Sequence, residues 1–226
     1  MTSEEPGLAE RLETVGAAIA DAAREAGRDP ASITTIVVTK FHPGSLVREL
    51  AALGVSQFGE SRHQEAQPKI AELSDLDATW HFIGQLQSKK ARSVRQYVDV
   101  IHSVDRPALS DALEGQSDRE VFIQVNLTED PDRGGVAPDS IDSLAERIGR
   151  TEGLRLLGLM AVAPLGADPR ASFATVRGLS DRLRESFPAA TALSIGMSGD
   201  FREAILEGAT HLRIGTAITG NRPVHG

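Results

Sequence analysis

Short apolar runs rich in β-branched residues alternate along this chain with amphipathic segments, and the alternation recurs eight times. We expect strands at 33–39, 55–58, 79–83, 98–102, 121–126, 154–159, 192–195 and 211–214. Helices are expected at 8–26, 45–53, 64–73, 88–96, 107–114, 140–150, 169–186 and 200–207. Strands that alternate with helices form parallel sheets, and eight repeats favour closure. The sequence therefore predicts an α/β fold, a single (β/α)8 TIM-type barrel with an additional N-terminal helix; a doubly wound open sheet is the alternative.

Composition excludes several classes of protein. The net charge of −8 leaves no basic surface for a nucleic acid, and the absence of cysteine excludes disulfides and thiolate metal sites. The acidic N-terminus lacks the apolar core of a signal peptide, and no apolar run approaches the roughly 20 residues of a membrane helix. No linker divides residues 1–226. We expect one domain in a cytoplasmic protein that contacts no membrane.

The first strand ends on a lysine. Residues 33–39 form an apolar run of the kind that is buried on both faces in a parallel sheet, and Lys40 follows at once. Barrels place their chemistry at the carboxyl ends of strands. Lys40 is therefore either a solvated strand exit or a functional amine.

Glycine-rich loops follow the last two strands, where barrels often bind phosphate. Gly196 and Gly199 flank Ser198, and Gly215 precedes Thr216. Glycines let the backbone approach a ligand, and the helix that begins near residue 200 points its free N–H groups toward the same space. The alternative is that these glycines only form tight turns.

An arginine occupies the last strand. Arg213 lies between Leu212 and Ile214, so if these two residues face the helices, Arg213 faces the barrel interior. A structural ion pair with Glu60 or Asp200 is the alternative. Lysine, phosphate loops and inward arginine together suit a phosphorylated aldehyde held as a Schiff base, and pyridoxal 5'-phosphate (PLP) is the obvious candidate.

Motifs along nearly the whole chain resemble those of the pyridoxal phosphate homeostasis proteins, the YggS-like group, whose barrel is similar to the N-terminal domain of alanine racemase and to fold-type III PLP enzymes. The matching stretches are Val37–Lys40, Phe58–Ser61, Trp80–Lys90, Ile101–Asp105, Ile123–Asn126, Gly158–Met160, Leu193–Ser198 and Arg213–Ile218. No single stretch would suffice, and together they make a strong signal.

The resemblance implies a cofactor site and a role for most of its residues. Lys40 would form the Schiff base, and Ser198, Gly215 and Thr216 would hold the phosphate. Arg213 would face the pyridine nitrogen and keep it unprotonated. The remaining implied site residues are Ser61, His81, Met160 and Met197. Many members of the family carry asparagine where this chain has Ser61, which puts any contact made by that amide in doubt.

The family is thought to bind, buffer and deliver PLP, which implies transient contact with PLP-dependent apo-enzymes. A racemase of this fold needs a second acid/base, which the alanine racemase family takes from a separate domain; the chain ends ten residues after Thr216, so we expect no such domain. The only tyrosine, Tyr97, is expected to serve packing. We therefore expect a monomeric PLP carrier rather than an enzyme. A small fold-type III racemase is the main alternative, and a phosphosugar enzyme with an imine on Lys40 is the weaker one.

Other polar residues receive plainer interpretations. Lys89 and Lys90 begin a predicted helix, where a solvated helix start is favoured over a second lysine that handles the cofactor. His102 and His211 show no spacing typical of metal ligands and are expected to lie on the surface or to serve packing.

Overall fold

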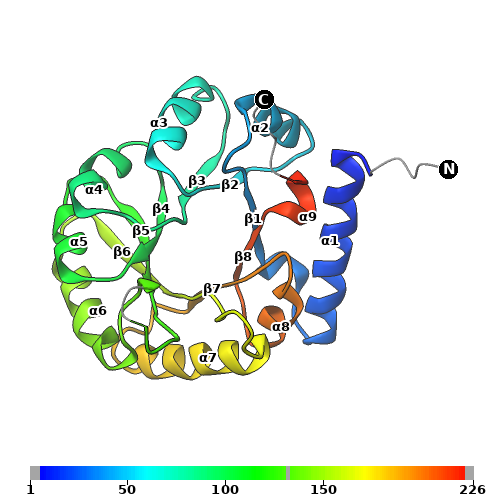
Figure 1. The fold of residues 1–226 in the computed structure, drawn as a ribbon. Helices are drawn as coiled ribbons and strands as arrows, with labels where there is room; N and C mark the ends of the chain where they lie inside the picture. Colours follow the sequence, from blue (N-terminus) through cyan, green and yellow to red (C-terminus); the bar gives the residue numbers. More distant parts are fainter. Residues whose placement is uncertain (1–5, 131–132, 222–226) are drawn as a thin grey trace.

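Eight parallel strands close into a barrel in chain order, as Figure 1 shows. The computed structural model describes residues 6–130 and 133–221. The strands are β1 (Thr34–Val38), β2 (Gln57–Glu60), β3 (Thr79–Phe82), β4 (Val100–Val104), β5 (Arg119–Gln124), β6 (Leu154–Met160), β7 (Ala192–Met197) and β8 (His211–Ile214). The predicted barrel with its additional N-terminal helix is confirmed, and the open-sheet alternative is wrong.

The helices form a ring around this barrel (Figure 1). They are α1 (Leu8–Glu25), α2 (Gly44–Ala52), α3 (His63–Glu72), α4 (Ser88–Val94), α5 (Pro107–Ala112), α6 (Ile141–Arg150), α7 (Pro169–Ser186), α8 (Phe201–Leu206) and α9 (Thr216–Thr219). The sequence did not predict α9, which has only four residues and covers little of the barrel. The N-terminal helix α1 packs against α8 and α9 and covers that side instead. In the described part of the chain, no helix is long and apolar enough to cross a membrane.

Strands β2 and β4 each lie two residues later than predicted. The predicted strands ended at Phe58 and His102, but the observed strands continue through the buried polar residues Glu60 and Ser103. Glu60 ends β2 and is 0% exposed, and Ser103 lies within β4 and is 1% exposed. Glu60 Oε1 is bonded to Thr39 and Lys69 from other elements, so the polarity of Glu60 did not mark the end of the strand.

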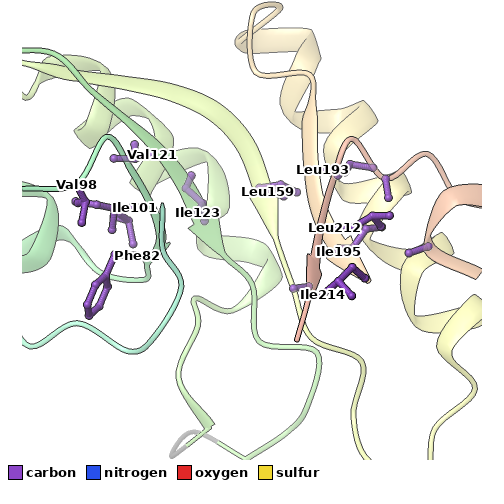
Figure 2. Packing of buried hydrophobic residues seen from close by; sticks show 14 of the residues in the cluster. Phe82, Val98, Ile101, Val121, Ile123, Leu159, Leu193, Ile195, Leu212 and Ile214 are labelled. Carbon is purple, nitrogen blue, oxygen red and sulfur yellow. The ribbon is translucent and has the colours of Figure 1, made fainter. Parts of the chain in front are cut away.

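The main core lies between the barrel and the helices. Figure 2 shows outward-facing strand residues of this core, among them Ile101, Ile123, Leu159, Leu212 and Ile214. Their neighbours along the strands point the other way, because side chains alternate in a strand. Inside the barrel, a small apolar cluster is formed by Val100, Phe122 and Met160.

A bulge in β6 sets the direction of Met160. Val121 pairs with Leu156, but Phe122 pairs with Gly158, so Leu157 is an extra residue in the ladder. A bulge changes which side chains face inward. Leu157 and Met160 therefore both reach the interior cluster, although they are three residues apart.

Candidate functional site

Closure of the barrel brings Lys40 beside the last strand. Val37 of β1 pairs with Ile214 of β8, so the exits of the two strands adjoin. Lys40 follows β1 and is exposed, and its Nζ lies 5.9 Å from the centroid of the Phe41 ring. Gly215 follows β8. Residues from the two ends of the sequence thus share the mouth of the barrel.

The loops after β7 and β8 are joined at this mouth by one hydroxyl group. The Ser198 Oγ accepts hydrogen bonds from the backbone N–H groups of Gly215, at 3.3 Å, and Ala217, at 3.4 Å. The first loop is fixed by Asp200, whose Oδ1 accepts from the Met197 N–H at 2.6 Å. Two backbone donors therefore converge on one oxygen atom beside the exit of β1.

A chain of hydrogen bonds fills part of the barrel interior. The Arg213 Nη1 donates to the Ser194 Oγ at 2.6 Å, and that hydroxyl lies 2.8 Å from the His102 Nδ1. The His102 Nε2 is 3.0 Å from the His81 Nδ1, and the His81 Nε2 is 2.8 Å from the Gln57 Oε1. Each group can donate in one direction if both histidines are neutral, from Arg213 to Gln57.

Burial keeps these histidines neutral. Loss of hydration lowers the pKa of His81 to about 3 and that of His211 to about 4, and it holds the pKa of His102 well below its ordinary value. Burial also lowers the pKa of Arg213 to about 10, so the guanidinium stays charged at neutral pH. Among the described residues of this hydrogen-bonded chain, Arg213 is therefore the one cation, and its partners are neutral.

Arg213 is oriented inward, as the alternation predicted, and is only 4% exposed. Its Nη2 donates to the Ala161 carbonyl at 2.9 Å, so both terminal nitrogens are bonded to the barrel wall. The alternative of an ion pair with Glu60 or Asp200 is wrong for the described residues. Glu60 pairs with Lys69, and Asp200 acts on Arg213 only through its charge, which opposes the fall in the pKa.

The buried histidines predict acid sensitivity. Their folded pKa values lie below the unfolded value near 6.5, so the unfolded chain takes up more protons as the pH falls below 6.5. For His81 and His102 together, we expect the free energy of unfolding to drop by about 2.5 kcal/mol between pH 7 and pH 5.5. Urea unfolding at the two pH values measures it. Glu60, whose pKa burial raises, acts in the opposite sense, but it is one group against His81, His102 and also His211. A free energy of unfolding that stayed constant would contradict the neutral network.

The other expected site residues divide between the mouth and the interior. Ser61 is half-buried after β2, Met197 is 37% exposed at the end of β7, and Thr216 is exposed at the start of α9. His81 and Met160 are each 2% exposed inside the barrel. Lys40, Ser198 and Gly215 are thus brought together at the mouth, with His81 and Met160 in the barrel interior.

Two features of the site were not predicted. His102 lies in the hydrogen-bonded interior chain and the ring of His211 lies edge-on to it, whereas we expected surface or packing roles. Their inward positions in β4 and β8 were the available signal. The buried pair of Glu60 and Lys69 was also missed, because nothing local marks Lys69 as buried. In the described chain, no group of histidine and acidic residues could hold a metal ion.

The two lysines of the predicted helix start lie on α4. Lys89 is exposed and Lys90 is half-buried. Lys90 lies near enough to His63 for its charge to help lower the pKa of that imidazole, after burial as the larger cause.

Comparison with known proteins identifies the family. Residues 18–223 match the model of the alanine racemase N-terminal domain. The pyridoxal phosphate homeostasis protein of Pseudomonas aeruginosa is 41% identical over 220 residues, which cover 95% of this chain and 96% of that protein. The chain belongs to the family of pyridoxal phosphate homeostasis proteins. The resemblance seen in the sequence motifs is thereby confirmed.

Solved structures agree with this family. PipY of Synechococcus elongatus, with PLP bound, has a TM-score of 0.82 and 38% identity, and the match covers 95% of this chain and all of that chain. The alanine racemase of Corynebacterium glutamicum shares the fold, with a TM-score of 0.69 at 15% identity. This chain spans 62% of that racemase, whereas it matches the homeostasis proteins nearly end to end.

Proposed function

We propose that this protein binds PLP as a Schiff base on Lys40 and acts in PLP homeostasis. One observation carries the proposal: the turn that presents Lys40 adjoins the two backbone donors of Gly215 and Ala217. An amine and a pair of N–H groups on neighbouring strand exits match the aldehyde and the phosphate of one small molecule. The related PipY has been solved with PLP bound.

The residues present fit a phosphate group. Ser198 Oγ already brings an oxygen atom into hydrogen-bond distance of both donors, so this position accepts an oxygen ligand. A side chain built on Gly199 would meet nothing within 4 Å, which leaves open space beside the loop. The carboxylate of Asp200 lies at the start of α8 and disfavours an anion there, so we do not assign the phosphate to the start of that helix. We therefore assign the phosphate to Ser198, Gly215, Ala217 and the hydroxyl of Thr216.

We assign the ring of the cofactor to the space between these donors and the barrel interior. Arg213 would face the pyridine nitrogen, and its fixed guanidinium favours an unprotonated nitrogen there. Bound PLP supplies an electrophilic aldehyde and an electron-withdrawing ring. Ser61, His81, Met160 and Met197 would form the walls of the ring pocket.

A holding role suits this site better than turnover. A cation opposite the pyridine nitrogen makes the ring a poor electron sink. The hydroxyl of the only tyrosine, Tyr97, is hydrogen-bonded to His63 Nδ1 at 2.9 Å, and burial raises the pKa of its phenol. It is therefore poorly suited to serve as an acid/base. As part of the same proposal, the protein is a single-domain cytoplasmic monomer that passes PLP to apo-enzymes by transient contact.

Titration with PLP and with pyridoxal, which lacks the phosphate, tests the proposal. PLP is expected to produce a new visible absorbance band from the Schiff base. Pyridoxal should bind at least about 100-fold more weakly than PLP, since it cannot make the two or more hydrogen bonds that the charged phosphate accepts. Equal affinities, or an unchanged spectrum with PLP, would reject the proposed site.

A further inference from the structure

A buried ion pair lies behind the turn that carries Lys40. Lys69 of α3 places its Nζ 2.6 Å from Oε1 of Glu60, at the end of β2. The same ammonium donates to the Thr39 carbonyl at 2.9 Å, and the Thr39 hydroxyl donates to Glu60 Oε1 at 2.8 Å. Glu60 is fully buried and Lys69 is 9% exposed. Two strand ends and a helix thus meet at one carboxylate.

The ion pair is not explained by stability. Removing two charges from water is costly, and a well-packed apolar pair is often as stable. Glu60 Oε2 has no hydrogen-bond partner among the described residues, so the hydration it loses is only partly replaced. The pair instead fixes the position of a backbone carbonyl. Lys69 donates a hydrogen bond to the carbonyl of Thr39, which is the residue before Lys40.

The held carbonyl also closes the turn. The His42 N–H donates to the Thr39 carbonyl at 3.1 Å, and Phe41 has a φ of +68°. These two features define a type II turn with Lys40 at its second position. The third position normally holds glycine, and an aromatic residue in this conformation is strained. The turn therefore needs support from its surroundings.

Helix α3 supplies further support for the strained residue. Glu65 Oε2 accepts a hydrogen bond from the Phe41 N–H at 3.3 Å. The guanidinium carbon of Arg62, just before α3, lies 5.0 Å from the centroid of the Phe41 ring, within cation–π range. Together with Lys69, these contacts hold both the carbonyl before Lys40 and the residue after it.

We propose that Lys69 and Glu60 are positioning residues for Lys40, which fix its turn so that the amine is aimed at an aldehyde ligand. The inference rests on the proposed function. The Lys40 amine adds to the aldehyde carbon, its two protons pass to the carbonyl oxygen, and that oxygen leaves as water as the C=N bond forms. A fixed turn raises the rate of this step and has little effect on the phosphate, which is held by other loops.

The test compares the rate of Schiff base formation with the total amount of PLP bound. In the double variant Glu60→Gln/Lys69→Met, no lone charge is left buried. Stopped-flow absorbance should show Schiff base formation about tenfold slower or more, because small errors of orientation cost large factors in rate. Equilibrium dialysis, which counts all bound PLP, should change by less than about threefold, because the phosphate donors are intact.

A second variant covers the case in which the double variant does not fold. Glu65→Ala removes a half-exposed side chain that holds Phe41, and it should slow Schiff base formation about threefold, since one of several supports is lost. Glu72→Ala, at the other end of α3, is the matched control and should react at the wild-type rate. Suppose that the wild type forms a Schiff base, and that both Glu65→Ala and the folded double variant form it at the wild-type rate. The positioning role is then overturned and the proposed function stands. If the wild type forms none, both are overturned.

Discussion

Replacing Lys40 by alanine is expected to abolish the covalent attachment of PLP and to leave only weak, reversible binding. Without the amine no C=N bond can form at this turn, whereas Ser198 and the backbone donors of Gly215 and Ala217 remain in place. We expect the affinity for PLP to fall about 100-fold, equivalent to about 2.7 kcal/mol. Absorbance titration and equilibrium dialysis measure the two effects separately.

The matched control is Lys89→Ala, which removes an exposed lysine from the start of α4. It should keep the wild-type spectrum and affinity. A Lys40→Ala protein that still developed the visible band would show that another amine forms the Schiff base, and Lys40 would lose its assigned role.

Replacing Gly158 by alanine should cause a large loss of stability. Gly158 has a φ of +153°, and a Cβ there would lie 1.9 Å from the Ala192 carbonyl oxygen in β7. Backbone strain and overpacking add, so we expect the free energy of unfolding to fall by about 3 kcal/mol or more. Urea unfolding followed by circular dichroism measures it.

Gly178→Ala provides the matched control. Gly178 lies in the exposed face of α7, and a Cβ there meets nothing within 4 Å. Alanine should stabilise this helix by about 0.5–1 kcal/mol. If Gly158→Ala and Gly178→Ala had the same free energy of unfolding, the bulge in β6 would not require glycine. The orientation of Met160 would then need another explanation.

Most of the fold could be predicted because its signals are local. Apolar periodicity placed α7 and β8 with the observed bounds, and the alternation of strand and helix gave the barrel. The errors arose where tertiary contacts outweigh local pattern. The predicted second strand stopped at Phe58, whereas β2 runs on through Glu60, whose partners come from other elements.

The candidate site was predictable in outline for a different reason. Lys40, Ser198 and Gly215 follow strands, and closure of a barrel brings strand exits together whatever their distance in sequence. The inward orientation of Arg213 followed from alternation. Its partner Ser194 could not be predicted, because a serine in an apolar run carries no local signal of pairing.

The support behind Lys40 was beyond the sequence for a similar reason. Lys69 lies in a helix rich in polar residues, where a lysine is normally solvated. Only the packing of α3 against the ends of β1 and β2 shows that its ammonium is enclosed by Glu60 and Thr39.

Peptide mapping after borohydride reduction tests the central claim most directly. Borohydride converts a Schiff base into a stable secondary amine, so the modified lysine can be located by mass spectrometry. Reduction of the wild-type protein with PLP should place the pyridoxyl group on Lys40 alone, with none on Lys69, Lys89 or Lys90. A pyridoxyl group on another lysine, or on none, would contradict the proposed site.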